Sequence, residues 1–451
     1  MYKDAAMFIP LSKSQTSMFK SWVKISSLFP SIDTNDNKPK EIANNVLGYD
    51  VYCATSGYSG LAASLAAMAE YERNCATEKR IFTRHIYPQD ENGNPIYNPS
   101  GKYVIKMYIN GTWRQVIVDD AIPISDKDIP LCSHIPNSAE LWIPIMEKAC
   151  AKVRCGYENI GKKPSLDIFI LTSWIPERIN LKSMEAARVW EKIAGDILVD
   201  QKIMVVNTGL VENEKIVGLK SFHSYAVFGT MQVGEKQMFL LKNTYPVYTP
   251  KLKYSWEDSA NWTEELKKAC SYYSYVEWGS RIFWTDIESL IENFDYLDIN
   301  WNPAKLAYRQ SVWDFIKGSS ILDDRINLTH VPQYTLEFQP GPGDIYPSVY
   351  FYVVVNKLHT KEELLIAEET PSSLIGEDLI GISLFYNDRY IKISSAEHPL
   401  NELELTADTS KAYKFMISKD MLIGGRHLNL AMRTFLRSRD LFYRYEVINK
   451  I

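Results

Sequence analysis

The 451-residue sequence contains no hydrophobic run long enough to cross a membrane. A transmembrane helix needs about 18 or more consecutive apolar residues, and neither the N-terminal segment MYKDAAMFIPLSKSQ nor any later stretch supplies them. The first residues also lack the apolar centre of a signal peptide. We therefore expect no transmembrane segment and a cytoplasmic location.

A strong charge of either sign is also absent. The chain has 50 lysines and arginines against 55 aspartates and glutamates, which gives a net charge of −5, and no basic run is found. Spread over this length, so small a charge does not attract nucleic acid or an anionic membrane by itself. We expect no nucleic-acid partner.

Cysteines are few, and their spacing does not match a metal site. In a reducing compartment such residues are buried thiols rather than disulfides. The six are Cys53, Cys75, Cys132, Cys150, Cys155 and Cys270.

The composition that is present is that of a globular protein, with 46% hydrophobic and 23% charged residues. The length allows about two to four domains. Pattern changes divide the chain into a polar lead-in, a helix-rich region, a strand-rich region, a linker and a final region of short strands. These cover residues 1–45, 46–170, 171–305, 306–327 and 328–451.

Three patterns predict secondary structure most clearly. Residues 60–73, GLAASLAAMAEYER, are apolar and rich in alanine, which indicates a helix buried on all sides. KYVIKMYINGTWRQVIVDD alternates on both sides of Asn110–Gly111, which predicts a β-hairpin. Short strands separated by turn residues in the final region are typical of a β-sandwich.

Three polar residues could form a catalytic group. Ser59 lies at the start of the predicted helix, where the helix dipole stabilises a nucleophile's anion. His223 begins one predicted strand and Asn243 ends the next, so neighbouring strands could bring them together. Taken alone, each residue also has an ordinary structural interpretation: a helix cap, a structural hydrogen-bonding histidine and a turn residue.

Several segments, in chain order, resemble the calpain cysteine proteases, in particular the atypical PalB-type calpains. FHSYAV is similar to the family's Gly-His-Ala-Tyr-Ser-Val, and KNTYP stands where Arg-Asn-Pro-Trp is expected. The resemblance extends over roughly residues 15–450. Its other segments are YSGLAASLAAMAEYER, GKYVIKMYINGTWRQVIVDDAIP, LWIPIMEKACAKVRCGYENIG, DIFILTSWIPE and IFWTDIESLIENFDYLDINWNP.

The resemblance implies an α+β fold: a papain-like two-lobe protease core, followed by a C2-like antiparallel β-sandwich similar to calpain domain III. Aligned on the family's Ser-Leu pair, the catalytic cysteine falls on Ser59, while the histidine and asparagine are kept as His223 and Asn243. Cys53 occupies the position of the oxyanion-hole glutamine. That change removes a donor worth about 3 kcal/mol of transition-state stabilisation.

These replacements lead to three hypotheses. The first is an inactive calpain-like pseudoprotease that acts as a binding scaffold. The second is an active intracellular endopeptidase that uses Ser59, or Cys53, with His223 and Asn243. The third is a structural subunit of a larger cytoskeletal or axonemal assembly, located at the cytoskeleton or a cilium.

The resemblance also bears on ligands. We expect protein partners, with weak peripheral membrane contact through the C2-like domain as a further expectation. Typical calpains bind calcium through acidic loops, but no loop here has dense acidic spacing. Asp119 and Asp120 are interpreted as a structural turn. We therefore expect no cofactor and no metal site, and calcium binding is unsupported by the sequence.

Overall fold

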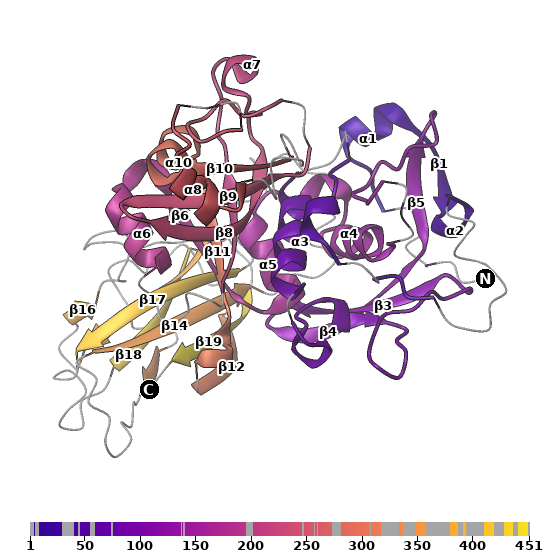
Figure 1. Cartoon of the computed structure of the whole chain (residues 1–451). Coiled ribbons are helices and arrows are strands. Elements are labelled where there is room, and N and C mark those ends of the chain that lie inside the picture. Colours follow the sequence, from indigo (N-terminus) through magenta and orange to yellow (C-terminus); the bar gives the residue numbers. More distant parts are fainter. Residues whose placement is uncertain are drawn as a thin grey trace. The chain divides into compact units, whose positions relative to one another are not determined.

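The structure is a computed structural model of the chain, shown in Figure 1. The residues it describes are 4, 9–28, 40–43, 46–54, 59–73, 75–136, 138, 140–194, 202–245, 248–256, 258, 260–272, 281–306, 308–316, 333–336, 348–357, 379–386, 391–393, 410–418, 428–435 and 441–449. The chain divides into two compact units: the first comprises residues 1–108 and 113–301, and the second comprises residues 109–112 and 302–451.

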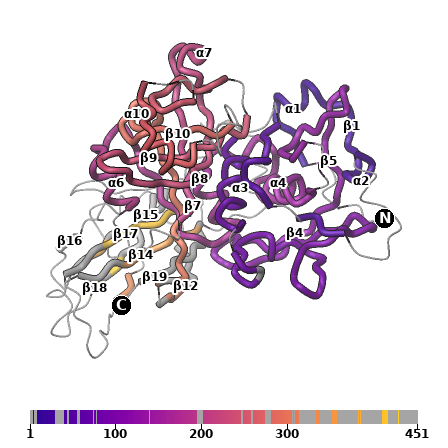
Figure 2. Tube along the Cα trace, in the orientation of Figure 1, coloured from indigo at the N-terminus to yellow at the C-terminus, as the bar shows by residue number. Residues whose placement is uncertain are grey.

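The central helix of the first unit is α3, Ser59–Glu72, close to the predicted residues 60–73. Every residue from Ser59 to Ala69 is buried. Small alanine side chains allow neighbours to approach on all sides. Helix α3 packs against α5, Pro164–Thr172 (Figure 1), and against β7, Lys202–Asn207, and β8, Ser224–Val233 (Figure 2). A helix buried all round thus connects the helical part of this unit to its large sheet.

Two details fix the position of α3. A methyl group on Gly60 would collide with the backbone carbonyl of Gly161, so only glycine permits this approach. At the other end, the buried Glu72 carboxylate accepts backbone N–H groups from Ile81, Phe82 and Thr83. The segment after α3 is therefore held to the helix end.

The helical part contains two small sheets, of order β1-β5 and β2-β3-β4. The predicted hairpin is present as β3 and β4, and its turn residues Asn110 and Gly111 both have positive φ, as a tight hairpin turn requires. The other elements here are α1 (Lys13–Met18), α2 (Ile25–Leu28), α4 (Trp142–Val153), β1 (Phe19–Lys24), β2 (Ile86–Tyr87), β3 (Lys102–Ile109), β4 (Thr112–Asp119) and β5 (Ala121–Ser125).

The strand-rich part is built on a six-stranded sheet of order β10-β9-β8-β7-β11-β6. Every neighbouring pair is antiparallel. Its strands are β6 (Ile175–Asn180), β7 (Lys202–Asn207), β8 (Ser224–Val233), β9 (Lys236–Asn243), β10 (Ile282–Asp286) and β11 (Tyr296–Trp301). The accompanying helices are α6 (Ala186–Ala194), α7 (Glu214–Val217), α8 (Glu264–Ala269) and α10 (Ile287–Asn293).

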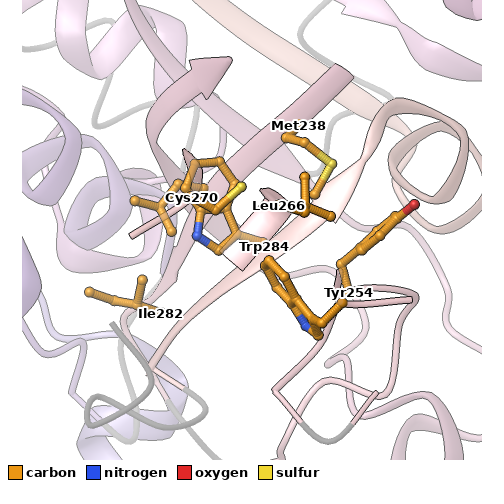
Figure 3. Close-up of a cluster of buried hydrophobic side chains, with 8 residues drawn as sticks. Met238, Tyr254, Leu266, Cys270, Ile282 and Trp284 are labelled. Atoms are coloured by element: carbon orange, nitrogen blue, oxygen red, sulfur yellow. The ribbon is translucent and has the colours of Figure 1, made fainter. Parts of the chain in front are cut away.

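One cluster of buried side chains joins β9 and β10 to the segment that includes α8 (Figure 3). Aromatic rings and sulfur atoms fill this cluster, and Trp256 stacks on Trp262 with ring centroids 5.8 Å apart. The buried members are Met238, Leu240, Tyr254, Trp262, Leu266, Cys270, Ile282 and Trp284. The packing fixes β9, whose last residue is Asn243.

The second unit contains two four-stranded antiparallel sheets, of order β12-β19-β14-β17 and β13-β18-β15-β16. Residues Phe351–Val355 of β14 are all buried, as expected for a strand between two others. The strands are β12 (Tyr308–Ile316), β13 (Gln333–Leu336), β14 (Ser348–Lys357), β15 (Leu379–Tyr386), β16 (Ile391–Ile393), β17 (Ser410–Ser418), β18 (Leu428–Phe435) and β19 (Leu441–Asn449).

Strand β12 lies inside residues 306–327, the range expected to be a linker. It pairs along its whole length with β19, near the other end of this unit. The domain boundaries and the C2-like character of the two sheets stay predictions.

Candidate active site

Ser59 is the first residue of α3, and its side chain is buried, with the residue 8% exposed. Its Oγ accepts a hydrogen bond of 3.0 Å from the backbone N–H of Ser224, the first residue of β8. The hydroxyl therefore lies at the helix N-terminus and against the large sheet, which is where the sequence predicted a nucleophile.

His223 and Asn243 are brought together by neighbouring strands. His223 immediately precedes β8, Asn243 ends β9, and His223 Nε2 lies 3.0 Å from Asn243 Oδ1. Both residues are 2% exposed. The expected side-by-side arrangement of histidine and asparagine is thus present in the structure.

A second hydrogen bond identifies the tautomer of His223. Asn243 Oδ1 also accepts a hydrogen bond from the backbone N–H of Tyr245 at 3.0 Å. The side-chain atom of Asn243 that lies against Tyr245 N and His223 Nε2 is therefore the carbonyl oxygen and not the amide nitrogen. An oxygen can only accept, so His223 Nε2 must carry the proton. In the neutral imidazole this leaves Nδ1 as the basic nitrogen.

Burial governs the charge of His223. Its pKa is lowered to about 4, chiefly by removal from water; the Asn243 hydrogen bond and Glu214 partly oppose this effect, and Lys220 adds to it. The ring is therefore neutral at pH 7. A neutral ring with a free Nδ1 can accept a proton, but it cannot stabilise a neighbouring anion by its charge.

The described residues show no hydrogen bond between Ser59 and the His223 ring. Among the described residues, Ser224 is the only hydrogen-bond partner of the Ser59 hydroxyl. A working nucleophile is normally hydrogen-bonded to its base. The three predicted residues therefore form an oriented His–Asn pair and a serine held separately by the backbone.

Cys53 is buried beside the end of β9, and its N–H donates to the Thr244 carbonyl at 3.0 Å. Its Sγ donates to the Ala54 carbonyl at 3.4 Å. Burial raises the pKa of this thiol well above its usual range, with the charge of Glu147 adding to the effect. Cys53 is thus a protonated thiol near the site, and its proposed oxyanion-hole position stays a prediction.

Sequence reasoning missed two features of this region. Lys220 Nζ lies 4.4 Å from the centre of the Tyr245 ring, which follows Asn243 by two residues. Phe222, directly before His223, has a φ of 49° and is 77% exposed. No sequence pattern predicts a bulky side chain in the left-handed region, which costs about 1 to 3 kcal/mol for a non-glycine residue.

Comparison with known proteins identifies the family. The model described as "Calpain family cysteine protease" matches residues 21–300. The chain belongs to the calpain family. That range includes α3, the six-stranded sheet except for its residue Trp301, and all the residues of the candidate site, which confirms the resemblance to calpains and the mixed α+β protease domain.

The chain is similar to Calpain-7 and to PalB-type calpains. It is 34% identical to Calpain-7 of Mus musculus over 349 residues, which is 74% of this chain and 41% of the relative. It is 28% identical to the calpain-like protease palB/cpr-8 of Neurospora crassa over 352 residues, 73% of this chain and 35% of the relative. The match therefore spans about two fifths of these curated relatives.

Metal-binding clusters and membrane-spanning helices are both absent from the described residues. Among the described residues, no three histidine, cysteine or acidic side chains are grouped so that they could hold a metal ion. In the same part of the chain, no helix combines the length and the apolar character needed to cross a membrane.

Proposed function

We propose that this calpain-family chain is a pseudoprotease that acts by binding protein partners, and that Ser59 stands in place of the family's catalytic cysteine. The observation that carries the proposal is the bonding of the Ser59 hydroxyl, which accepts the Ser224 N–H and has no hydrogen bond to the His223 ring among the described residues. The hydroxyl is thus not paired with the base that would have to take its proton.

The chemistry of the two nucleophiles supports the same proposal. A cysteine thiol has a pKa near 8.5 and becomes a thiolate beside a helix N-terminus and a charged histidine. A serine hydroxyl does not ionise in that way and needs a hydrogen-bonded base together with an oxyanion hole. Here the base is neutral at pH 7, and Cys53 replaces the expected glutamine.

A fluorophosphonate probe tests the proposal directly, because it labels activated serines. We expect no labelling of Ser59 in the native protein, and Ser59→Ala is the matched control. Ser59→Cys, which puts a thiol back at the helix start, is examined with an epoxide probe for thiols. Fluorophosphonate labelling of the native protein that disappears in Ser59→Ala would refute the proposal.

A second candidate function is a serine-dependent endopeptidase. The observation in its favour is the His223–Asn243 hydrogen bond of 3.0 Å, which leaves His223 Nδ1 able to accept a proton. This function requires the Ser59 hydroxyl to form a hydrogen bond with that nitrogen. Cleavage of casein by the native protein, lost in Ser59→Ala, would establish this function.

The proposal also concerns the second unit and the partner class. We propose that the two C-terminal sheets form a C2-like sandwich and that the chain binds cytoskeletal protein in the cytoplasm. The support is the pair of four-stranded antiparallel sheets. Co-sedimentation with polymerised tubulin is the test; a monodisperse protein that stays in the supernatant would contradict the cytoskeletal assignment.

A further inference from the structure

Thr208, the residue directly after β7, holds the backbone of His223 through two hydrogen bonds. The Thr208 N–H donates to the His223 carbonyl at 2.9 Å, and the His223 N–H donates to the Thr208 hydroxyl oxygen at 2.9 Å. The same hydroxyl lies 2.6 Å from the Lys220 carbonyl oxygen and 3.1 Å from that of His223. Both Thr208 and His223 are buried. One threonine thus satisfies a buried N–H group of the candidate base and closes the loop before it.

The turn before His223 needs such support, because it is strained. Phe222 has a φ of 49°, in the left-handed region, and its side chain is exposed. An exposed side chain gains no burial energy that could offset the cost of this conformation. Hydrogen bonds to the residues after β7 therefore stabilise the turn. They include those of Thr208 and a bond of 2.8 Å from the Phe222 N–H to the Gly209 carbonyl.

Asn207, the last residue of β7, makes a similar contact with Ser224. The two residues are paired across β7 and β8, and the Ser224 hydroxyl donates to Asn207 Oδ1 at 2.7 Å. The N–H of Ser224 is the group that donates to the Ser59 hydroxyl. Asn207 is therefore bonded to the residue that holds Ser59.

An ion pair on β11 and β6 anchors Asn207. Its Nδ2 donates to Asp298 Oδ2 at 2.8 Å. A carboxylate oxygen only accepts, so this contact orients the amide with Oδ1 towards Ser224. Asp298 is buried and accepts two hydrogen bonds from the Arg178 guanidinium, at 2.8 and 2.7 Å. A charge-assisted pair of this kind gives the carboxylate, and with it the amide, a fixed position.

We propose that Asn207 and Thr208 are positioning residues of the candidate site. Thr208 fixes His223, and Asn207 fixes the Ser224 N–H that holds Ser59. Both act through the first residues of β8 and the residue before it, and neither takes part in a reaction. We rest this inference on the proposed function only in treating His223 as the base of the site.

The pKa of the His223 ring, measured by proton NMR, tests the role of Thr208. Thr208→Val keeps the shape of the side chain but leaves the buried His223 N–H without its acceptor. The segment then shifts towards water. Because burial is the chief cause of the lowered pKa of about 4, we expect this pKa to rise by about 1 unit or more. Thr208→Ser, which keeps the hydroxyl, should have the native value.

Thr172→Val is the matched control. Thr172 is also buried, and its hydroxyl also accepts a backbone N–H, that of Trp174 at 3.1 Å, and donates to a backbone carbonyl, that of Ile168 at 2.7 Å. Loss of this hydroxyl should lower the stability but leave the His223 pKa unchanged. A native His223 pKa in Thr208→Val, or an equal rise in Thr172→Val, would overturn the proposal.

Hydrogen exchange of the Ser224 amide tests the role of Asn207, and it decides the matter should Thr208→Val not fold. Asn207 is half-buried, and we expect Asn207→Ala to accelerate this exchange about 3- to 10-fold, the effect of one lost hydrogen bond. Ser165→Ala removes a different hydrogen bond to Asp298, of 2.7 Å, and should leave the exchange unchanged.

Equal exchange rates in the native protein and Asn207→Ala, or the same acceleration in Ser165→Ala, would overturn the proposal. Neither the ring pKa nor the amide exchange depends on catalysis. Labelling by a fluorophosphonate therefore tests the proposed function separately, and either proposal can fail without the other.

Discussion

At the scale of single residues, the chemistry of the candidate site depends on the atom to which each polar group is hydrogen-bonded. Asn243 Oδ1 is fixed by the Tyr245 N–H, and this fixes the proton on His223 Nε2. The Ser59 hydroxyl is bonded to the Ser224 N–H instead of to that ring. His223 and Asn243 thus keep the geometry of a base and the residue that orients it, while Ser59 is not hydrogen-bonded to that base.

His223 should titrate well below an ordinary histidine. Because burial lowers its pKa from 6.5 to about 4, the unfolded chain binds more protons between these two values. Stability should therefore fall as the pH drops from 6.5 to 4. Proton NMR of the His223 ring measures the pKa, with His223→Gln to assign the signal. A pKa at or above 6.5 would contradict the buried, neutral ring.

Cys53 should be unreactive in the folded protein. Its thiol is buried with a raised pKa, whereas Cys75 is the one half-buried cysteine among the six. We expect iodoacetamide at pH 8 to modify Cys75 first and Cys53 only after unfolding, as followed by peptide mass spectrometry. Modification of Cys53 before Cys75 would instead favour Cys53 as a nucleophile.

At the scale of helices and strands, sequence patterns predicted the elements that depend on interactions between residues close together in the chain. The alanine-rich helix, the Asn110–Gly111 hairpin and the strands carrying His223 and Asn243 were read from periodicity and turn residues, and all are present. Strand β12 was missed because it depends on pairing with β19, far along the chain.

In the candidate site too, contacts between neighbouring elements could be predicted, and contacts between distant parts of the chain could not. Histidine and asparagine could be predicted to meet, because β8 and β9 are consecutive antiparallel strands. The bond from Ser224 to Ser59 could not, since it joins a backbone amide to a helix 165 residues earlier.

The close approach of α3 to Gly161 predicts a large effect of one methyl group. Gly60→Ala should destabilise the protein by about 1 to 3 kcal/mol, because the new Cβ would collide with the Gly161 carbonyl. Urea unfolding measures the change. Gly229→Ala is the control, since a Cβ there meets nothing within 4 Å. Equal stability of the two variants would contradict this prediction and would show that the backbone at Gly161 can move away from the added methyl group.

At the scale of the whole molecule, family membership and activity are separate questions. Residues 21–300 match the calpain protease family, and the matched region keeps a helix, a histidine and an asparagine arranged around one site. The proposed loss of activity depends mainly on one atom in that site, the hydroxyl oxygen of Ser59. The fold can be kept for binding while the reaction is lost.

Turnover of a casein or general peptide substrate by purified native protein, beside Ser59→Ala, tests this account most directly. The account predicts no cleavage above background by either protein, because the Ser59 hydroxyl is not paired with His223. Cleavage by the native protein that is lost in Ser59→Ala would contradict it and establish a serine-dependent protease.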